Sequence, residues 1–405
     1  MSDTSTTAPG ATTAATASAT TIAVYGASGT TGALVAAELA RRGHRLRLVG
    51  RDRARLHGVV EALAGDRHPA PEVAVAPAHD HAALAHAFAG CDVVVACAGP
   101  FTRIGGEVVA ATLDAGAHYL DVCAEQAFLR ACFEEHESAA RHRGLVVVNG
   151  VGFEGALGDW AARWAAAALC GVTDEDAPVA HAPVERLAGD RPLDELVVAY
   201  GLDGFVPTPG TQRALLASVT GPGVVWTAGR WDPARPGARR RELNFGPALG
   251  SRTARSFPSG EIITVPRHVA VRRVETFVAL GGPRWLTTGL GLAAPLFAFA
   301  RGPLPAILEG LADPHAVPDP VRRSAARFAV VAQARRGFER TQVTITGHDV
   351  YAVTAYLAAT AAARLAVRGD GPCGVLAPSE VFPAAASLDA LDAYGELTVT
   401  TSFDR

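Results

Sequence analysis

The sequence contains no lysine, so all 37 residues of its Lys+Arg count are arginines. A lysine ammonium is required for Schiff-base chemistry, for a Walker A phosphate loop and for the Tyr-x-x-x-Lys arrangement of short-chain dehydrogenases. The absence of lysine therefore excludes all three. A proton donor in this chain must be a tyrosine, a histidine, a protonated carboxylic acid or water.

Paired cysteines and metal-ligand motifs are absent as well. The six cysteines form no CxxC pair and most lie in apolar segments, so we interpret them as reduced thiols of a cytoplasmic protein. The thirteen histidines include no HExxH motif, and we predict no metal site. A net charge of only -3, with 19% charged residues, gives no sign of nucleic-acid binding.

Length and hydropathy patterning indicate two domains, since 405 residues exceed the roughly 250 to 300 at which a single core stops growing. Residues 1–20 are almost wholly Thr, Ala, Ser and Gly, and we expect a disordered tail there. From residue 21 onward, short apolar runs alternate with helical patterns, which is typical of a parallel sheet covered by helices. We expect strands at 21–26, 45–50, 72–76, 92–97, 117–122 and 145–149, with helices near 31–42, 52–64, 80–89, 105–115 and 125–143.

The alternation ends near residue 150. Residues 151–345 are expected to form a substrate or dimerisation domain with a helix near 157–170 and strands at 195–201, 224–228, 261–265 and 269–279. Residues 346–405 supply a long helix (350–367) that is free to return to the first domain. The expected fold class is α/β: an N-terminal Rossmann domain (21–150) with a doubly wound parallel sheet, and a second α+β domain on a mainly antiparallel sheet.

An uncharged apolar stretch, 285–300, is interrupted by Pro295 and two glycines and is shorter than the roughly 20 residues of a membrane-spanning helix. We expect a buried helix or the subunit contact of a homodimer. An apolar substrate channel or a peripheral lipid contact remain alternatives.

A glycine-rich turn directly follows the first expected strand and opens the first expected helix. In such a turn the first glycine permits the tight bend, the second lets the backbone approach a pyrophosphate, and the third lets the helix pack on the strand. The phosphates then meet free N–H groups at the positive end of a helix. The turn reads Gly26-Ala27-Ser28-Gly29-Thr30-Thr31-Gly32.

The end of the second strand distinguishes the two nicotinamide dinucleotides, because NAD enzymes usually place an acidic residue there for the ribose 2′-hydroxyl. Here Arg51 follows the strand and Arg53 lies two residues on. Arginines form charge-assisted bonds to a 2′-phosphate, so NADP(H) is the expected cofactor. Asp52 is an acidic residue at the same place, so NAD(H) is the alternative cofactor unless this carboxylate instead caps the following helix.

The fourth strand ends in Ala98-Gly99-Pro100-Phe101, at the edge of the sheet where ligands of open α/β folds bind. We expect this turn under the nicotinamide ribose, with a simple strand-ending turn as the alternative.

Four side chains are the candidate catalytic groups: Tyr119, Asp121, Glu125 and, in the second domain, Tyr200. The first three follow the fifth strand at the carboxyl edge. Each also has a structural alternative: Tyr119 as core, Asp121 as a helix cap and Glu125 in the first turn of a helix.

These residues resemble the saccharopine dehydrogenase-like oxidoreductases, including the trans-acting enoyl reductases of mycobacterial lipid assembly. The resemblance rests on the glycine turn, Gly50-Arg51-Asp52, the Ala-Gly-Pro-Phe turn, Gly106-Glu107, residues 118–121 with Glu125, Gly152-Phe153 with Asp159, and residues 374–378. The family's Phe-Asp-Ser-Val-Pro-Ser-Asp run is Phe153-Glu154-Gly155-Ala156-Leu157-Gly158-Asp159 here. A common adenine-side aspartate is replaced by Pro77, which leaves Asp80 for that role. Thr208-Pro209-Gly210-Thr211 resembles the family's Gly-Gly-Thr turn, a candidate anion or substrate loop.

The resemblance implies hydride transfer between NADP(H) and a C=C (enoyl) or C=N (imine) bond of a small molecule or a carrier-bound acyl chain, in secondary metabolism. The residues by themselves predict dinucleotide binding, and a non-catalytic dinucleotide sensor or scaffold is the alternative. The run Arg239-Arg240-Arg241 is either a solvated loop or a docking surface for an acidic carrier protein.

Overall fold

The computed structural model describes residues 20–64, 69–172, 186–221, 223–281, 319–393, 395 and 397–404. The apolar stretch 285–300 and the expected tail up to residue 19 lie outside these ranges. Within the described ranges, no helix combines the length and the apolar character needed to cross a bilayer.

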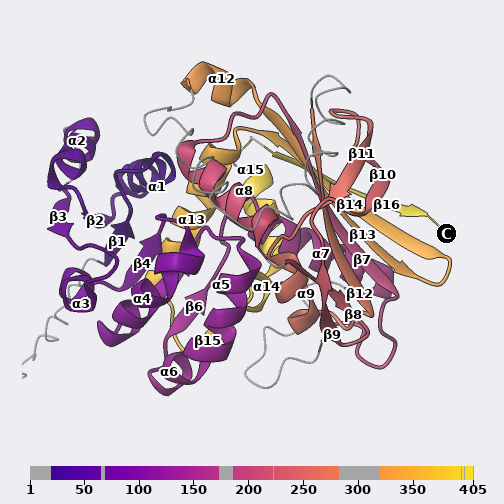
Figure 1. The fold of residues 1–405 in the computed structure, drawn as a ribbon, viewed down its shortest axis with the longest axis horizontal. Helices are drawn as coiled ribbons and strands as arrows, with labels where there is room; N and C mark the ends of the chain where they lie inside the picture. Colours follow the sequence, from indigo (N-terminus) through magenta and orange to yellow (C-terminus); the bar gives the residue numbers. More distant parts are fainter. Residues whose placement is uncertain are drawn as a thin grey trace, which may run out of the picture.

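Seven parallel strands form the first sheet, in the order β15-β6-β5-β4-β1-β2-β3 (Figure 1). The reversal of strand order between β1 and β4 is the switch point at which doubly wound folds bind ligands. The strands are β1 (Thr21–Tyr25), β2 (Arg45–Gly50), β3 (Glu72–Val75), β4 (Val93–Ala96), β5 (His118–Asp121), β6 (Val146–Val148) and β15 (Gly374–Leu376).

The helices of this domain lie where the sequence predicted them, apart from small shifts at their ends. They are α1 (Thr30–Arg41), α2 (Arg53–Leu63), α3 (His81–Phe88), α4 (Phe101–Asp114), α5 (Gln126–Ala131), the π-helical turn η1 (Cys132–His136) and α6 (Glu137–His142). The late helix α13 (Val350–Ala366) packs against α1, β1, β4 and β5, so C-terminal residues supply both a strand and a helix to the Rossmann half.

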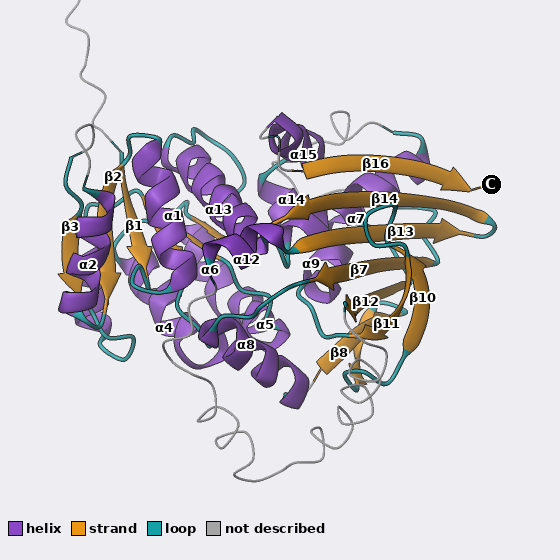
Figure 2. Ribbon diagram, turned by 90° about the horizontal axis from the view of Figure 1, so that it is seen from above, coloured by secondary structure: helices purple, strands orange, loops and turns teal. Residues whose placement is uncertain are grey.

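The second sheet has nine strands, with β10-β11-β12-β7-β13-β14-β16 side by side and β8 joining β12 to β9 (Figure 2). Only the β12–β7 pair among these strands is parallel. The strands are β7 (Glu195–Asp203), β8 (Gly223–Thr227), β9 (Arg230–Ala234), β10 (Arg240–Asn244), β11 (Ser251–Ser256), β12 (Arg273–Leu280), β13 (Arg327–Arg336), β14 (Glu339–His348) and β16 (Leu397–Asp404). The predicted fold class, a parallel Rossmann sheet plus a mainly antiparallel second sheet, is confirmed.

Helix α7 (Ala156–Cys170) packs on β7, β13 and β14, and α9 (Glu261–His268) packs on β12 and β8. The remaining helices of this half are α8 (Pro209–Thr220), α12 (Pro320–Ala325), α14 (Pro378–Val381) and α15 (Ala384–Ala393). One hydrophobic core runs from the Rossmann strands through α7 to β13, so the two halves share a packed interior.

The predicted strand at 261–265 is wrong, because these residues form α9. The run Ile262, Ile263 and Val265 has high β-propensity, but such propensity depends on context. Here almost every side chain of α9 is buried, and Thr264 and His268, one turn apart, both reach Asp159 on α7. Tertiary contacts thus override the local preference.

Candidate dinucleotide site and adjoining acid cluster

The glycine turn bends sharply between β1 and α1 at the carboxyl edge of the first sheet. Gly26 has φ +80°, a left-handed conformation that favours glycine, and a Cβ there would lie 2.8 Å from the Cβ of Ala98. A Cβ at Gly32 would lie 2.3 Å from the carbonyl oxygen of Gly26. Glycine is therefore required at position 26 by the close approach of Ala98, and at position 32 by a contact within the turn itself.

Helix α1 begins at this turn, and its cap residue Gly29 offers no side chain to the first N–H groups. Uncapped N–H groups at a positive helix end form an anion site. Ser28, Thr30 and Thr31 line the same turn and are partly exposed. Arg55 braces it from α2, donating from Nη2 to the carbonyl oxygen of Ser28 at 3.0 Å. Sequence reasoning missed Arg55, although it belongs to the same basic run as Arg51 and Arg53.

Arg51 and Arg53 are exposed after β2, next to the glycine turn, as a 2′-phosphate site requires. Asp52 caps α2, accepting from the backbone N–H of Arg55 at 3.1 Å, so its carboxylate is engaged away from a ribose. Asp80 likewise caps α3, accepting from the N–H of Ala83 at 3.0 Å. Its expected adenine-side role remains a prediction.

Residues Ala98 to Phe101 form the turn between β4 and α4, and Ala98 touches the glycine turn. Glu125 holds this turn in place. Its two carboxylate oxygens accept from the backbone N–H groups of Phe101 and Thr102, both at 2.9 Å. Glu125 is buried and acts here as a side-chain cap for α4 rather than for its own helix.

Asp121 is fully buried at the end of β5. It accepts hydrogen bonds from the N–H groups of Cys123 (2.9 Å) and Gly150 (2.8 Å) and from Asn149 Nδ2 (2.8 Å). Burial raises the pKa of Asp121 to about 6, against the lowering effect of these donors. Tyr119 is fully buried beside it, and burial raises the pKa of its phenol well above the ordinary range. Neither side chain meets the surface.

Tyr200 on β7 is buried, and its hydroxyl hydrogen-bonds to the carboxylate of Glu261. Both groups accept a hydrogen bond from the backbone N–H of Gly155, at 3.2 Å for the Tyr200 hydroxyl and 3.1 Å for the Glu261 carboxylate. Glu154, half-buried, is the residue before that glycine. Sequence reasoning did not select Glu154 or Glu261, since they are 107 positions apart and meet only through the packing of α9 on the first half.

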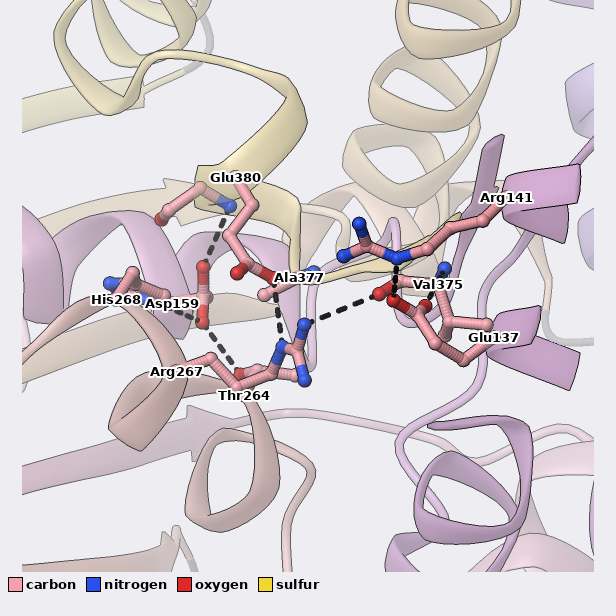
Figure 3. Close-up of polar contacts among 10 residues, drawn as sticks. Glu137, Arg141, Asp159, Thr264, Arg267, His268, Val375, Ala377 and Glu380 are labelled. Atoms are coloured by element: carbon pink, nitrogen blue, oxygen red, sulfur yellow. Dashed lines mark hydrogen bonds and ion pairs between the residues drawn. The ribbon is translucent and has the colours of Figure 1, made fainter. Parts of the chain in front are cut away.

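Asp159 lies at the centre of a second buried network, which Figure 3 shows. Its carboxylate accepts from Thr264 Oγ1 at 2.6 Å, from the N–H of Ser379 at 2.9 Å, and contacts His268 Nε2 at 2.9 Å. Burial alone would raise the pKa of Asp159, but His268 and these donors hold it below its usual value. The network joins α7, α9 and α14, which favours a structural role for Asp159.

Arg267 and Glu137 anchor the C-terminal segment nearby (Figure 3). Arg267 pairs with Glu380 at 2.9 Å, and Glu137 accepts from the N–H of Val375 at 2.5 Å. Strand β15 is thus attached to both halves of the protein. Among the described residues, no cluster of three or more His, Cys, Asp or Glu side chains could hold a metal ion.

The residues present fit a dinucleotide phosphate. The exposed Gly29 carries no side chain at the start of α1, α1 presents N–H groups without a side-chain cap, and two exposed arginines follow β2. By this geometry the first half is a Rossmann-type nucleotide-binding domain.

Comparison with known proteins identifies the domain more closely. Residues 22–148 match the family model of the saccharopine dehydrogenase NADP binding domain. A Mycobacterium tuberculosis protein provisionally named a trans-acting enoyl reductase is 36% identical over 140 residues, which is 34% of this chain and 33% of that protein. The trans-acting enoyl reductase of Mycobacterium ulcerans is 34% identical over 135 residues, 33% of this chain and 32% of its own length. The chain thus matches about a third of each relative's length.

The fold likeness extends over most of the chain. The saccharopine dehydrogenase (L-Glu forming) of Saccharomyces cerevisiae superposes with a TM-score of 0.57 at 14% identity, covering 95% of this chain and all of that one. Residues 22–148 therefore match a saccharopine dehydrogenase NADP-binding domain, and the chain shares the fold of the yeast enzyme. The predicted resemblance and the predicted cofactor, NADP(H), are confirmed.

Proposed function

We propose that this chain is an NADP(H)-dependent oxidoreductase that reduces a C=C or C=N bond of a metabolite or a carrier-bound acyl chain. The observation that carries the proposal is the glycine turn at α1 with Arg51 beside it, inside an NADP-binding domain. Nicotinamide chemistry supplies a hydride, and the protein contributes binding, orientation and electrostatics.

The cofactor-binding residues act by position. The N–H groups at the start of α1 would bind the pyrophosphate, and Arg51 with Arg53 would bind the 2′-phosphate. Glu125 fixes the turn from Ala98 to Phe101 by accepting from the N–H groups of Phe101 and Thr102. Held in this way, the turn would support the nicotinamide half of the cofactor.

The names of the mycobacterial relatives support an acyl-type substrate. They do not distinguish an enoyl group from an imine, so both belong to the proposal. Docking to an acidic carrier through residues 239–241 is less well supported, because Arg239 pairs with Glu275 and Arg241 with Glu195. We place the reaction in the cytoplasm, where NADPH is available and the six unpaired cysteines stay reduced.

One observation favours the alternative, a dinucleotide sensor without chemistry. The four catalytic candidates chosen from the sequence, Tyr119, Asp121, Glu125 and Tyr200, are all buried. Asp121, Glu125 and Tyr200 also have structural hydrogen-bond partners. Their catalytic roles remain predictions.

The test is consumption of NADPH by the purified full-length protein with a trans-2-enoyl thioester and with a cyclic imine. Oxidation of NADPH that depends on either probe supports the reductase. Tight NADPH binding without oxidation by any enoyl or imine probe supports the sensor.

A further inference from the structure

Two glutamates meet where the Rossmann half joins the second half. Glu154 follows β6, in the loop that leads to α7, and Glu261 is the first residue of α9. Glu261 is fully buried, and one of its oxygens is occupied by the Tyr200 hydroxyl and the N–H of Gly155. Glu154 directly precedes Gly155, whose N–H donates to Glu261, so the loop places Glu154 next to the residue that binds Glu261.

Two buried polar atoms in this space have no hydrogen-bond partner. They are the second carboxylate oxygen of Glu261 and the hydroxyl oxygen of Ser259, both in residues with no exposed surface. The Ser259 hydroxyl lies close to the carboxyls of both Glu154 and Glu261 without well-aligned geometry. Leaving such atoms unsatisfied is costly, which points to a proton or ligand that completes the cluster.

The absence of a side chain at Gly158 leaves space for the Glu261 carboxylate and the Tyr200 hydroxyl. A Cβ at Gly158 would lie 2.3 Å from Glu261 Oε1 and 2.4 Å from the Tyr200 hydroxyl. Any larger residue at the start of α7 would displace both groups. The cluster is therefore accommodated by the packing of three elements, α7, α9 and β7.

The charges around the two glutamates oppose ionisation of both. Glu154 experiences the charges of Glu261 and Glu125, and Glu261 experiences the charge of Asp159. Among the described contacts, no arginine pairs with either glutamate. Burial and the charge of Glu261 raise the pKa of Glu154 to about 8, and burial also raises the pKa of Glu261. Neighbouring carboxyls in such surroundings do not both ionise easily.

The position of Glu154 in the fold is suitable for delivering a proton to a substrate beside the nicotinamide. Glu154 follows the end of β6, which neighbours β5 and then β4 at the nicotinamide half of the carboxyl edge. Glu125, which fixes the turn after β4, is near enough to raise the pKa of Glu154. Glu154 is also the one member of the pair with exposed surface.

We propose that Glu154 is the general acid of the reduction, with Glu261 and Tyr200 as positioning residues. This inference rests on the proposed function. The hydride from NADPH brings two electrons to the electrophilic carbon of the C=C or C=N bond, and the π bond breaks. The O–H bond of Glu154 breaks, and its proton adds to the neighbouring carbon or nitrogen. Glu154 is left as a carboxylate and regains a proton from solvent through its exposed side.

The experiment compares wild type, Glu154→Gln and Glu154→Asp, with Glu339→Gln as a matched control on an exposed hairpin. Far-UV circular dichroism and NADPH affinity check folding. Single-turnover oxidation of NADPH is then followed across pH with a trans-2-enoyl thioester and a cyclic imine. Infrared spectra across the same pH range report the protonated carboxyl without any substrate.

We expect Glu154→Gln to bind NADPH as wild type does but to lose about 10²- to 10⁴-fold in single-turnover rate, the range for removal of a general acid. The wild-type rate should fall as pH rises through about 8, because the acid must be protonated. An infrared carboxyl band should titrate in that range in wild type and in Glu339→Gln, and should be absent in Glu154→Gln. Glu154→Asp should recover part of the rate.

Equal rates and pH profiles in wild type and Glu154→Gln would overturn the inference, as would a carboxyl band that still titrates near pH 8 in the variant. Failure of the proposed function has a different signature: wild type itself binds NADPH and reduces neither probe. The two failures are therefore distinguishable within one data set.

Discussion

Gly32→Ala tests the glycine turn most sharply. The added Cβ would lie 2.3 Å from the carbonyl oxygen of Gly26 and 2.9 Å from the Cα of Ala27, and both are backbone atoms that no side-chain rotation can move away. The turn or the start of α1 must therefore shift. The N–H groups that face the pyrophosphate would shift with it.

Introducing a methyl group into a tightly packed site costs about 1–3 kcal/mol. If that cost falls on the bound state, at about 1.4 kcal/mol per tenfold change, NADPH affinity drops by roughly 5- to 150-fold. If it falls on the free protein as well, Tm drops by a few degrees per kcal/mol. Fluorescence titration with NADPH and a thermal melt separate the two contributions.

Gly58→Ala is the matched control. Gly58 is exposed on α2, and a Cβ there would meet no atom within 4 Å. We expect unchanged NADPH affinity and a slightly higher Tm, since alanine favours helix over glycine. A Gly32→Ala protein that binds NADPH as tightly as wild type would refute the assignment of this turn.

Three further predictions concern the arginine, the buried aspartate and the half-buried glutamate. Arg51→Ala should weaken NADPH binding by roughly 10- to 100-fold, because a charged hydrogen bond contributes about 1.5–3 kcal/mol, and should leave the binding of NADH, which lacks the 2′-phosphate, unchanged. Equal losses of affinity for both dinucleotides, measured by calorimetry, would argue against the 2′-phosphate site. Asp159→Asn should destabilise the protein by about 3 kcal/mol or more in urea unfolding, because His268 loses its buried charged partner. The exposed Asp370→Asn should leave the midpoint unchanged, and a wild-type midpoint for Asp159→Asn would contradict the network. Glu154→Gln should flatten the pH dependence of the free energy of unfolding. In wild type the folded state holds an extra proton between pH 4.5 and about 8, so this free energy falls by up to about 1.4 kcal/mol per pH unit as pH rises. An equal slope in the variant would disprove the raised pKa of Glu154.

The parts of the fold predicted from sequence are those with strong local signals. Strands β1, β4 and β6 are almost wholly apolar runs, and the glycine turn lies between a strand and a helix that are each recognisable alone. Strands β10 and β11 were missed because their sequences, Arg240–Asn244 and Ser251–Ser256, are charged and partly exposed. β10 pairs with β11 and β11 pairs with β12, and no apolar pattern in the two strands indicates this pairing.

The cofactor half of the site was predictable for the same reason, since its residues lie in short motifs. The acid cluster was not. Glu125 was predicted as a catalytic group, with the first turn of its own helix as the structural alternative. It lies at the start of α5, but its carboxylate caps the start of α4, 23 to 24 positions earlier. Glu154 and Glu261 meet only because residues 261–268 fold as a helix, which their β-branched sequence concealed. Contacts between distant segments have no local signature.

The most direct test of the account is calorimetric titration of the wild-type protein with NADPH and with NADH. The account predicts that NADPH binds at least tenfold more tightly, because Arg51 and Arg53 meet the 2′-phosphate that NADH lacks. Tighter binding of NADH, or binding of neither dinucleotide, would contradict it.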